Sequence, residues 1–312
     1  MKAVVFAYSN VGDRCLRVLR ARGVEVPLVV THRDAPGEAI WFARVADTAA
    51  ELGLRVVHGD DPNDPALRES VAAARPDAIF SFYFRSLLPP ALLALAPRGT
   101  FNMHGSLLPQ YRGRAPTNWA IVRGETETGA TLHEMIARAD AGRIVDQQAV
   151  PILPDDTGQQ VFDKVTVAAE QVLWRSTPAI AAGAVRWRPN DIARGSYFGK
   201  RTPEDGRIDW SLPAAQVYDL VRAVAPPYPG AFTDVAGMRL VIGAARRSPL
   251  PAGVRGPAGA PGLHVRDGEI VGVCGDGGEL AIRQLLVADR PVAAAELQAL
   301  LASRETATHG IA

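Results

Sequence analysis

Two residues that could do chemistry, Asn102 and His104, are embedded in an apolar run that begins at Phe101. Because they are two positions apart, an extended strand would direct both side chains to the same face. A loop rich in Gly, Pro and Arg follows, and the segment from Pro116 has the pattern of a helix. A carboxamide beside an imidazole suits a reaction that builds negative charge on a carbonyl oxygen and moves a proton near neutral pH. The same pair is common in structural roles, so its surroundings must decide.

The start of the chain predicts the sheet that would carry this pair. Residues Lys2 to Ala7 form an apolar strand, a polar turn covers 8–12, and Asp13 can cap a helix that runs to about Arg22. A second strand over 24–31 completes a βαβ unit, which indicates a parallel sheet with right-handed crossovers. The turn lacks the G-x-G-x-x-G pattern, so we expect a Rossmann-like architecture without a nicotinamide cofactor.

Later segments continue the same alternation of strand and helix. We expect helices over 38–52, 64–74, 116–122 and 157–182, and strands over 55–57, 77–82, 100–104, 130–136 and 144–150. Ligands of open parallel sheets bind beyond the carboxyl ends of the strands. The strand ends at Tyr8, at residues 83–88 and at His104 are therefore expected to share one crevice.

The sequence changes in character near residue 201. From there short apolar runs alternate with Gly and Pro, which is typical of a small β-barrel, although residues 214–223 have a helical pattern. We therefore predict an α/β chain. A Rossmann-like, mostly parallel sheet with helices on both faces covers residues 1–200, and a C-terminal β-barrel-like (OB-like) domain covers 201–302. Residues 303–312 are expected to form a loose tail.

Composition narrows the class of partner. The 312 residues carry 34 basic and 33 acidic side chains, and a net charge of +1 gives no bulk reason to expect nucleic acid. No apolar stretch reaches the length of a membrane span, and the apolar opening is too short for a signal peptide. The two cysteines, Cys15 and Cys274, lie far apart without metal-ligand spacing. We expect a cytoplasmic protein with no membrane partner and no metal.

Four stretches carry a more specific signal: HGSLLPQYRGRAP at 104–116, GETETG at 124–129, RADAG at 138–142 and APPYPGAF at 225–232. Together they closely resemble the folate-dependent formyltransferase family, over nearly the whole chain. The resemblance implies an enzyme that moves a formyl group from the co-substrate 10-formyltetrahydrofolate to an amine. It implies that Asn102 stabilises an oxyanion, His104 carries a proton and Asp140 stabilises the imidazolium. Spacing alone does not place Asp140 beside His104.

The expected binding regions follow from this resemblance and from the strand ends. The positions that match the family's folate-binding residues are Ser86, Leu87, Leu88, Arg114, Ile136, Ala137, Arg138, Ala139 and Asp140. For the second substrate we expect residues at the first strand end and near the domain junction, where charge and stacking can hold a pyrophosphate and a base: Tyr8, Ser9, Asn10, Arg201, Arg222 and Tyr228. His133 is expected to have a structural or exposed role.

Within the family the chain is most similar to the branch that forms the formyltransferase half of bifunctional polymyxin-resistance enzymes. The stretches at 80–85, 111–119 and 124–133 carry this similarity, although Ser86 stands where that branch has His. The branch formylates UDP-4-amino-4-deoxy-L-arabinose in lipid A modification, which implies a small nucleotide sugar as partner. These 312 residues hold no decarboxylase domain, so we expect either a stand-alone transferase that acts with a separate decarboxylase or a part excised from a bifunctional enzyme.

Two alternatives stay open. Methionyl-tRNA formyltransferases resemble the chain in fold and motif, but they carry a basic insertion after the second strand, whereas residues 32–41 are short and charge-balanced here. A protein that only binds or hydrolyses formyltetrahydrofolate is the second alternative. A separate substrate-reading domain after residue 200 favours a transferase.

Overall fold

The computed structural model describes residues 1–35, 37, 40–247 and 260–309. The chain forms two compact units, and each is described by itself. Unit 1 comprises Met1–Pro116, Glu127–Pro151 and Phe162–Gly199, and unit 2 comprises Thr117–Thr126, Ile152–Val161 and Lys200–Ala312. The chain therefore crosses between the units after residues 116, 126, 151, 161 and 199.

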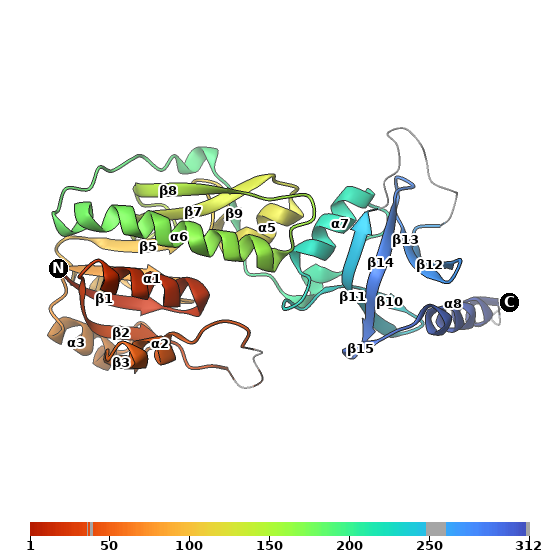
Figure 1. Ribbon diagram of the computed structural model, residues 1–312, viewed down its shortest axis with the longest axis horizontal. Coiled ribbons are helices and arrows are strands. Elements are labelled where there is room, and N and C mark those ends of the chain that lie inside the picture. Colours follow the sequence, from red (N-terminus) through yellow and green to blue (C-terminus); the bar gives the residue numbers. More distant parts are fainter. Residues whose placement is uncertain (36, 38–39, 248–259, 310–312) are drawn as a thin grey trace. The chain divides into compact units, whose positions relative to one another are not determined.

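Unit 1 is built on a seven-stranded sheet with the order β3-β2-β1-β4-β5-β7-β8 (Figure 1). Its strands are β1 Lys2–Ala7, β2 Glu25–Thr31, β3 Val56–His58, β4 Ala78–Phe82, β5 Thr100–His104, β7 Glu127–Glu134 and β8 Ile144–Pro151. The first five are parallel, β7 is antiparallel to β5, and β8 is antiparallel to β7. β1 and β4 are apolar at nearly every position because both faces of a central parallel strand are buried.

Helices cover both faces of this sheet: α1 Ser9–Ala21, α2 Val45–Glu51, α3 Pro65–Ala73, α4 Pro90–Leu93 and α6 Gly158–Ala181. Helices α1 and α6 lie across one face (Figure 1). Helices α3 and α4 pack on the opposite face, where Leu67 and Leu92 join Val4 and Phe6 in one buried cluster. Packing on both faces thus holds the sheet in place, and with it the residues at the strand ends.

The antiparallel pairing of β7 with β5 decides which side chains lie beside His104. In this register Asn102 is opposite His133, and His104 is opposite Thr131. Residues directly opposite each other in neighbouring strands point to the same side of the sheet. Four polar side chains from two strands therefore share one face at this place.

A segment that follows α6 returns to the loop after β5. This return segment, residues 190–198, contains the 3-10 helix η1 Ile192–Arg194 and the strand β9 Tyr197–Phe198. Strand β9 pairs in parallel with β6 Arg112–Gly113, at the end of the loop. Gly113 permits this close pairing, because its φ is +99° and a Cβ there would lie 2.1 Å from the Phe198 carbonyl oxygen.

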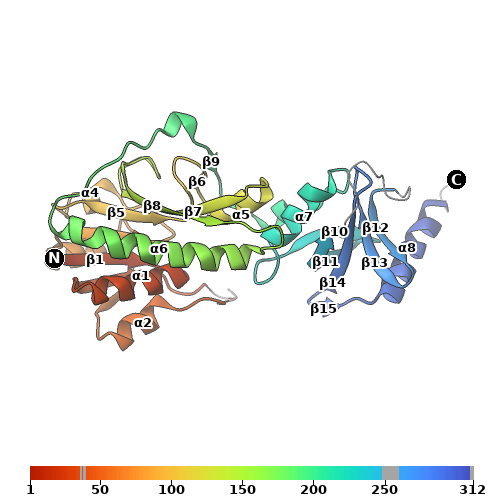
Figure 2. The same cartoon turned by 45° about the horizontal axis from the view of Figure 1, so that its top comes forward.

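Unit 2 is built on an antiparallel sheet that curls, as Figure 2 shows. The strand path is β10-β11-β14-β13-β12, and β15 pairs with β14. Its elements are α5 Pro116–Val122, η2 Pro203–Gly206, α7 Ala214–Ala223, β10 Ala231–Val235, β11 Met238–Arg247, β12 Gly262–Arg266, β13 Glu269–Val273, β14 Glu279–Val287, β15 Arg290–Pro291 and α8 Ala294–His309. Helix α7 packs against β11, and α8 against β12.

The predicted fold class is confirmed: a mostly parallel sheet with helices on both faces is followed by a curled antiparallel, OB-like sheet. Several segments differ from the prediction. The helix expected over 38–52 covers only Val45–Glu51, and residues 38 and 39 lie outside the described part. Helix α4 and the two-residue strands β6 and β9 were not expected, because segments this short carry little periodic signal. The expected tail is helical to His309, since 294–309 are rich in Ala, Leu and Glu; residues 310–312 lie outside the described part.

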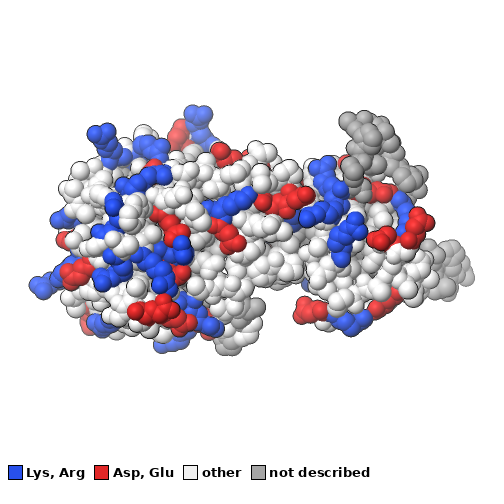
Figure 3. Space-filling view, viewed as in Figure 1, with Lys and Arg blue, Asp and Glu red and all other residues white. Residues whose placement is uncertain are grey.

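Charged side chains are interspersed by sign on the face of the molecule in Figure 3. Ion pairs of residues on α1 and α6 include Arg14–Glu170 at 2.8 Å, Arg17–Glu51 at 2.7 Å and Arg175–Asp146 at 2.5 Å. Among the helices described here, none combines the length and apolar character that a membrane span requires. The described residues also contain no group of three His, Cys, Asp or Glu side chains placed to hold a metal ion.

Candidate active site

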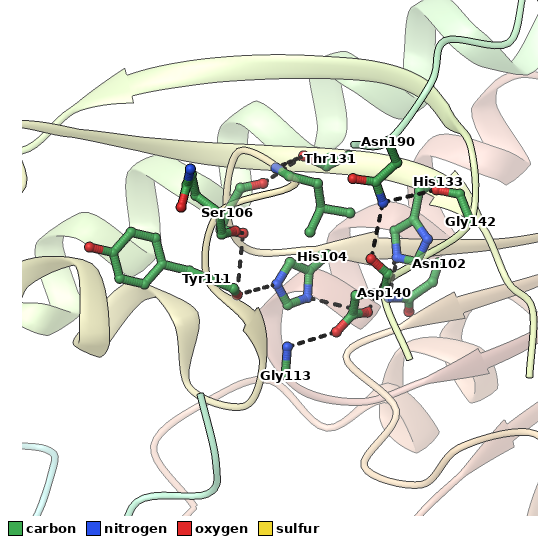
Figure 4. Close-up of polar contacts among 12 residues, drawn as sticks. Asn102, His104, Ser106, Tyr111, Gly113, Thr131, His133, Asp140, Gly142 and Asn190 are labelled. Atoms are coloured by element: carbon green, nitrogen blue, oxygen red, sulfur yellow. Dashed lines mark hydrogen bonds and ion pairs between the residues drawn. The ribbon is translucent and has the colours of Figure 1, made fainter. Parts of the chain in front are cut away.

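His104 ends β5, and its imidazole is buried. Its Nε2 lies 2.8 Å from the carbonyl oxygen of Tyr111, in the loop after the strand (Figure 4). Because a carbonyl oxygen only accepts hydrogen bonds, Nε2 carries a hydrogen. In the neutral ring the lone pair therefore belongs to Nδ1, which faces Asp140 Oδ1 at 3.7 Å. The Tyr111 carbonyl thus fixes Nδ1 as the basic atom of His104.

Asp140 lies between two imidazoles, as Figure 4 shows. Its Oδ1 is 3.7 Å from His104 Nδ1 and 3.4 Å from His133 Nε2, while Oδ2 accepts the Gly113 N–H at 2.8 Å. Burial alone would raise the pKa of the Asp140 carboxyl. The two imidazoles, when they are protonated, and the Gly113 N–H outweigh burial and hold this pKa well below its usual range. Asp140 is therefore ionised at neutral pH, and the loop between β7 and β8 brings it to the two residues on β5.

Asn102 contacts the second imidazole. Its Nδ2 lies 3.1 Å from His133 Nε2, and His133 Nδ1 lies 2.8 Å from the Glu134 carbonyl oxygen. The carbonyl requires a hydrogen on Nδ1, so in the neutral ring Nε2 accepts a hydrogen bond from the Asn102 amide. The contact uses one of the two N–H groups of that amide.

The position of His133 changes the expectation drawn from the sequence. An exposed role is excluded, because only 2% of the residue surface is accessible and the ring contacts both Asn102 and Asp140. Sequence reasoning missed this residue as part of the site. The available signal was a second pair of polar residues two apart in an apolar strand, Thr131 and His133, which repeats the pattern of Asn102 and His104.

The loop 106–113, which presents the Tyr111 carbonyl, is braced by β7 and β8. Thr131 Oγ1 donates to the Ser106 carbonyl at 2.6 Å and accepts the Leu108 N–H at 3.1 Å. Gln147 Nε2 donates to the same hydroxyl at 2.9 Å and to the Leu108 carbonyl at 2.8 Å. The orientation of the His104 ring is therefore tied to the sheet on this side.

An amide donor, an imidazole with one basic nitrogen and a buried carboxylate thus converge at the end of β5. Such a set can stabilise an oxyanion and move one proton, which is what acyl transfer to an amine requires. Two family models match the chain: "Formyl transferase" over residues 1–177 and "Formyl transferase, C-terminal domain" over 200–299. The chain belongs to the formyl transferase family. The prediction of a formyltransferase is confirmed at this level.

Solved structures share the fold of this formyltransferase. An N-formyltransferase from Helicobacter canadensis, in complex with folinic acid and dTDP-3-aminofucose, is 17% identical, with 90% of this chain and 98% of that chain covered and a TM-score of 0.71. WlaRD, a sugar 3N-formyltransferase solved with dTDP and 5-N-formyl-THF, is 17% identical, with 93% and 98% covered and a TM-score of 0.70. A sugar N-formyltransferase from a Shewanella species is 17% identical, with 78% and 96% covered and a TM-score of 0.62.

The positions predicted to bind folate lie after β4, β6 and β7. Leu87 and Ile136 are 69% and 44% exposed, so their apolar side chains are open to contact with a flat ligand such as a pterin. Leu88 is instead buried in the cluster behind β1, so it can contact a ligand only through its backbone. Arg114 is exposed and its backbone N–H donates to the Phe198 carbonyl at 2.9 Å. The other members range from half-buried to exposed: Ser86, Ala137, Arg138 and Ala139.

Tyr8, Ser9 and Asn10 lie at the end of β1 in unit 1, as predicted from the strand boundary. The Tyr8 ring is buried between His32, Phe42 and the guanidinium of Arg85, which lies 4.2 Å from the ring centroid. Asn10 Oδ1 accepts the Ala43 N–H at 2.8 Å. The Tyr8 ring and the Asn10 amide oxygen thus contact the protein itself, and Ser9 is buried.

The three predicted residues of unit 2 fall into two classes. Arg201 places its guanidinium 4.5 Å from the ring centroid of Trp119, and the Tyr228 side chain is half-buried beside Gly158. Arg222 does not fit the predicted substrate role, because its buried guanidinium is bound to Asp219 and to backbone carbonyls within the unit. The Arg222 guanidinium therefore joins segments of the chain and has few N–H groups left to bind a ligand.

Proposed function

We propose that this formyltransferase transfers the formyl group of 10-formyltetrahydrofolate to the amine of a nucleotide-linked amino sugar, and that the sugar is UDP-4-amino-4-deoxy-L-arabinose. The observation that carries the reaction type is the contact of His104 Nδ1 with the buried Asp140 carboxylate, next to the Asn102 amide. Residues 1–200 carry this chemistry in the proposal, and residues 201–302 read the substrate.

Asn102 stabilises the charge that develops during transfer. When the amine nitrogen bonds to the formyl carbon, the formyl oxygen becomes an oxyanion. Asn102 donates its second N–H to this oxygen, while His133 holds the first. The His133 ring therefore orients the amide, and the Glu134 carbonyl fixes the tautomer of the ring.

His104 moves the proton. The attacking amine must lose a proton, and Nδ1 accepts it because Nε2–H is bound to the Tyr111 carbonyl. The new N–H of the imidazolium then faces the Asp140 carboxylate, which is ionised and stabilises the charge as it forms. His104 returns the proton to the folate nitrogen as the bond from that nitrogen to the formyl carbon breaks.

Several features support a nucleotide sugar as the acceptor. Two proteins of the same fold were solved with a dTDP nucleotide together with folinic acid or 5-N-formyl-THF. The stretches at 80–85, 111–119 and 124–133 resemble the arabinose-modifying branch of lipid A modification and polymyxin resistance. In unit 2, the Arg201 guanidinium over the Trp119 ring and the Tyr228 ring in the motif at 225–232 offer charge and stacking to a nucleotide. In this proposal the enzyme works in the cytoplasm, alongside a separate decarboxylase.

The test offers 10-formyltetrahydrofolate with three acceptors in parallel: UDP-4-amino-4-deoxy-L-arabinose, a dTDP-4-amino sugar and initiator methionyl-tRNA. Mass spectrometry of the acceptors is expected to show a formyl group on the UDP sugar. Formylation of tRNA alone would refute the substrate, and release of formate without any formylated acceptor would identify a hydrolase. A His104→Ala variant with full turnover would refute the proton carrier.

A further inference from the structure

The return segment, residues 190–198, contacts both loops that carry the catalytic groups. All of these contacts lie within unit 1. The segment reaches the turn that holds Asp140 and the loop that holds the Tyr111 carbonyl, and no residue in it was singled out from the sequence. Its side chains do not belong to the predicted catalytic or folate-binding positions.

Asn190 holds the backbone of the Asp140 turn. Its Nδ2 donates to the carbonyl oxygens of Asp140 and Gly142, each at 3.0 Å (Figure 4). Among the described residues its Oδ1 is buried without a hydrogen-bond partner, so the donor end of the amide makes the contacts. Both N–H groups of the Asn190 carboxamide therefore bind this one turn.

The Asp140 turn needs such support because its backbone is strained. The φ of Asp140 is +49°, a left-handed conformation that a residue with a Cβ adopts only when its surroundings enforce it. Gly142 packs so closely that a Cβ there would lie 2.0 Å from the Glu134 carbonyl oxygen. The two bonds from Asn190 fix the direction of the carbonyls on either side of this bend, and with them the direction of the Asp140 side chain.

Ser196 holds the loop that orients His104. Its Oγ accepts the Tyr111 N–H at 2.9 Å and donates to Gln110 Oε1 at 3.2 Å. The Ser196 carbonyl accepts the Arg112 N–H at 3.0 Å, and the Tyr111 ring stacks on Phe198 with centroids 5.2 Å apart. Tyr111 also has a left-handed backbone, with φ +56°. The peptide groups on both sides of the Tyr111 residue are thus bound, one to Ser196 and one to His104.

We propose that Asn190 and Ser196 are positioning residues of the transfer reaction. Asn190 acts through Asp140, and Ser196 acts through the Tyr111 carbonyl that fixes the tautomer of His104. This inference rests on the proposed function, because its main readout is turnover. The return segment thus adds to the support that Thr131 and Gln147 give to the loop 106–113.

The decisive variant is Asn190→Asp, which keeps the size of the side chain but replaces the donating amide by a group that only accepts. Asn190→Ala serves as a second variant. We expect kcat to fall about tenfold to a hundredfold for both, because a small displacement of a catalytic group has effects of this order. The KM values for the folate and the amine are expected to stay within about twofold, since neither substrate is bound by Asn190.

A double-mutant cycle separates positioning from general destabilisation. If Asn190 acts through Asp140, the Asn190→Ala change has little further effect on kcat in an Asp140→Asn background. Ser196→Ala is expected to lower kcat in that background as much as it does alone, because it acts through the other loop. Additive losses for Asn190 and Asp140 would overturn the assignment of Asn190.

The matched control is Thr177→Val, which removes a buried hydroxyl bound to the Leu173 carbonyl at 2.6 Å on α6. It is expected to change thermal stability but to leave kcat at the wild-type value. Wild-type kcat in folded Asn190→Asp and Ser196→Ala would refute the positioning role, whereas wild-type protein without activity on any amine would refute the proposed function instead. In that case the ring 15N spectra of His104 and His133 still test the inference, because Asn190→Asp is expected to shift them and unchanged spectra would contradict it.

Discussion

At the scale of residues, the site depends on one carboxylate shared by two imidazoles. Asp140 Oδ1 faces His104 at 3.7 Å and His133 at 3.4 Å, and the Gly113 N–H takes the other oxygen. The Gly113 N–H and the protonated forms of both imidazoles favour the ionised form of Asp140, although the group is almost buried. This arrangement keeps a negative charge ready beside the atom that receives a proton.

The lowered pKa of Asp140 predicts a specific dependence of stability on acid. Because the folded-state pKa lies below the unfolded-state value, the ionised group stabilises the fold above about pH 4, and this contribution is lost as the pH falls towards the folded-state pKa. We expect the free energy of unfolding of Asp140→Asn to fall less steeply than that of the wild type between about pH 5 and about pH 2. Urea unfolding across this range measures it. Asp267→Asn removes an exposed carboxylate as a control, and identical slopes for Asp140→Asn and wild type would contradict the shift.

The Asn102 amide predicts a loss of rate without a matching loss of binding. Removing one oxyanion donor typically lowers kcat by about 10²–10³. We expect Asn102→Ala to show a decrease of this size in single-turnover formylation, with little change in KM. Asn63→Ala removes an exposed amide as the control. A decrease below about threefold would show that another group stabilises the oxyanion.

At the scale of elements, the pairing of β6 with β9 links the return segment to the catalytic loop. Gly113→Ala would place a Cβ 2.1 Å from the Phe198 carbonyl oxygen at a φ of +99°. We expect the variant to lose both thermal stability and kcat, because the same residue donates to Asp140. Gly183→Ala is the matched control: its φ is +68°, but no atom lies within 4 Å of the added Cβ.

The control should lose about 1 kcal/mol of stability from backbone strain and keep its kcat. Differential scanning calorimetry and formylation kinetics on the same preparations compare the two variants. Equal effects of the two substitutions on kcat would mean that the β6–β9 pairing has no part in the geometry of the site.

Strands and their chemistry were predictable to different degrees. The strand over 100–104 and its pair Asn102 and His104 follow from apolar periodicity, and the structure has the same boundaries. Asp140 lies in an irregular loop, so only the family resemblance could bring it to the site. His133 was missed because its importance depends on the register of β7 against β5, which local pattern does not encode. Asn190 and Ser196 act mainly on backbone groups, and their segment has no periodic pattern at all.

At the scale of the whole molecule, the chain crosses repeatedly between its two units. Residues 152–161 belong to unit 2, where Arg222 Nη1 donates to the carbonyls of Leu153 at 3.3 Å and Asp156 at 3.0 Å. Asn118 Nδ2 likewise donates to the Ala223 carbonyl at 2.7 Å. A cut after residue 199 therefore removes the partners of segments that come earlier in the chain.

We expect a fragment of residues 1–199 to be less stable than the full chain, because segments 117–126 and 152–161 lose their packing. Circular dichroism is expected to show a lower melting temperature, and the fragment should bind a dye for apolar surface. Addition of the 200–312 fragment serves as the complementation control. An isolated 1–199 fragment that melts at the temperature of the intact protein would show that these segments do not need unit 2.

The antiparallel neighbour of β5 also limits how this sequence can change in length. Thr131 and His133 lie on β7, which runs antiparallel to β5, the strand of Asn102 and His104. A deletion or insertion of one codon within 127–133 would exchange the inward and outward sides of this strand and remove both residues from the site. Length variation among descendants of this gene should therefore be absent from that stretch, even where the amino acids themselves drift.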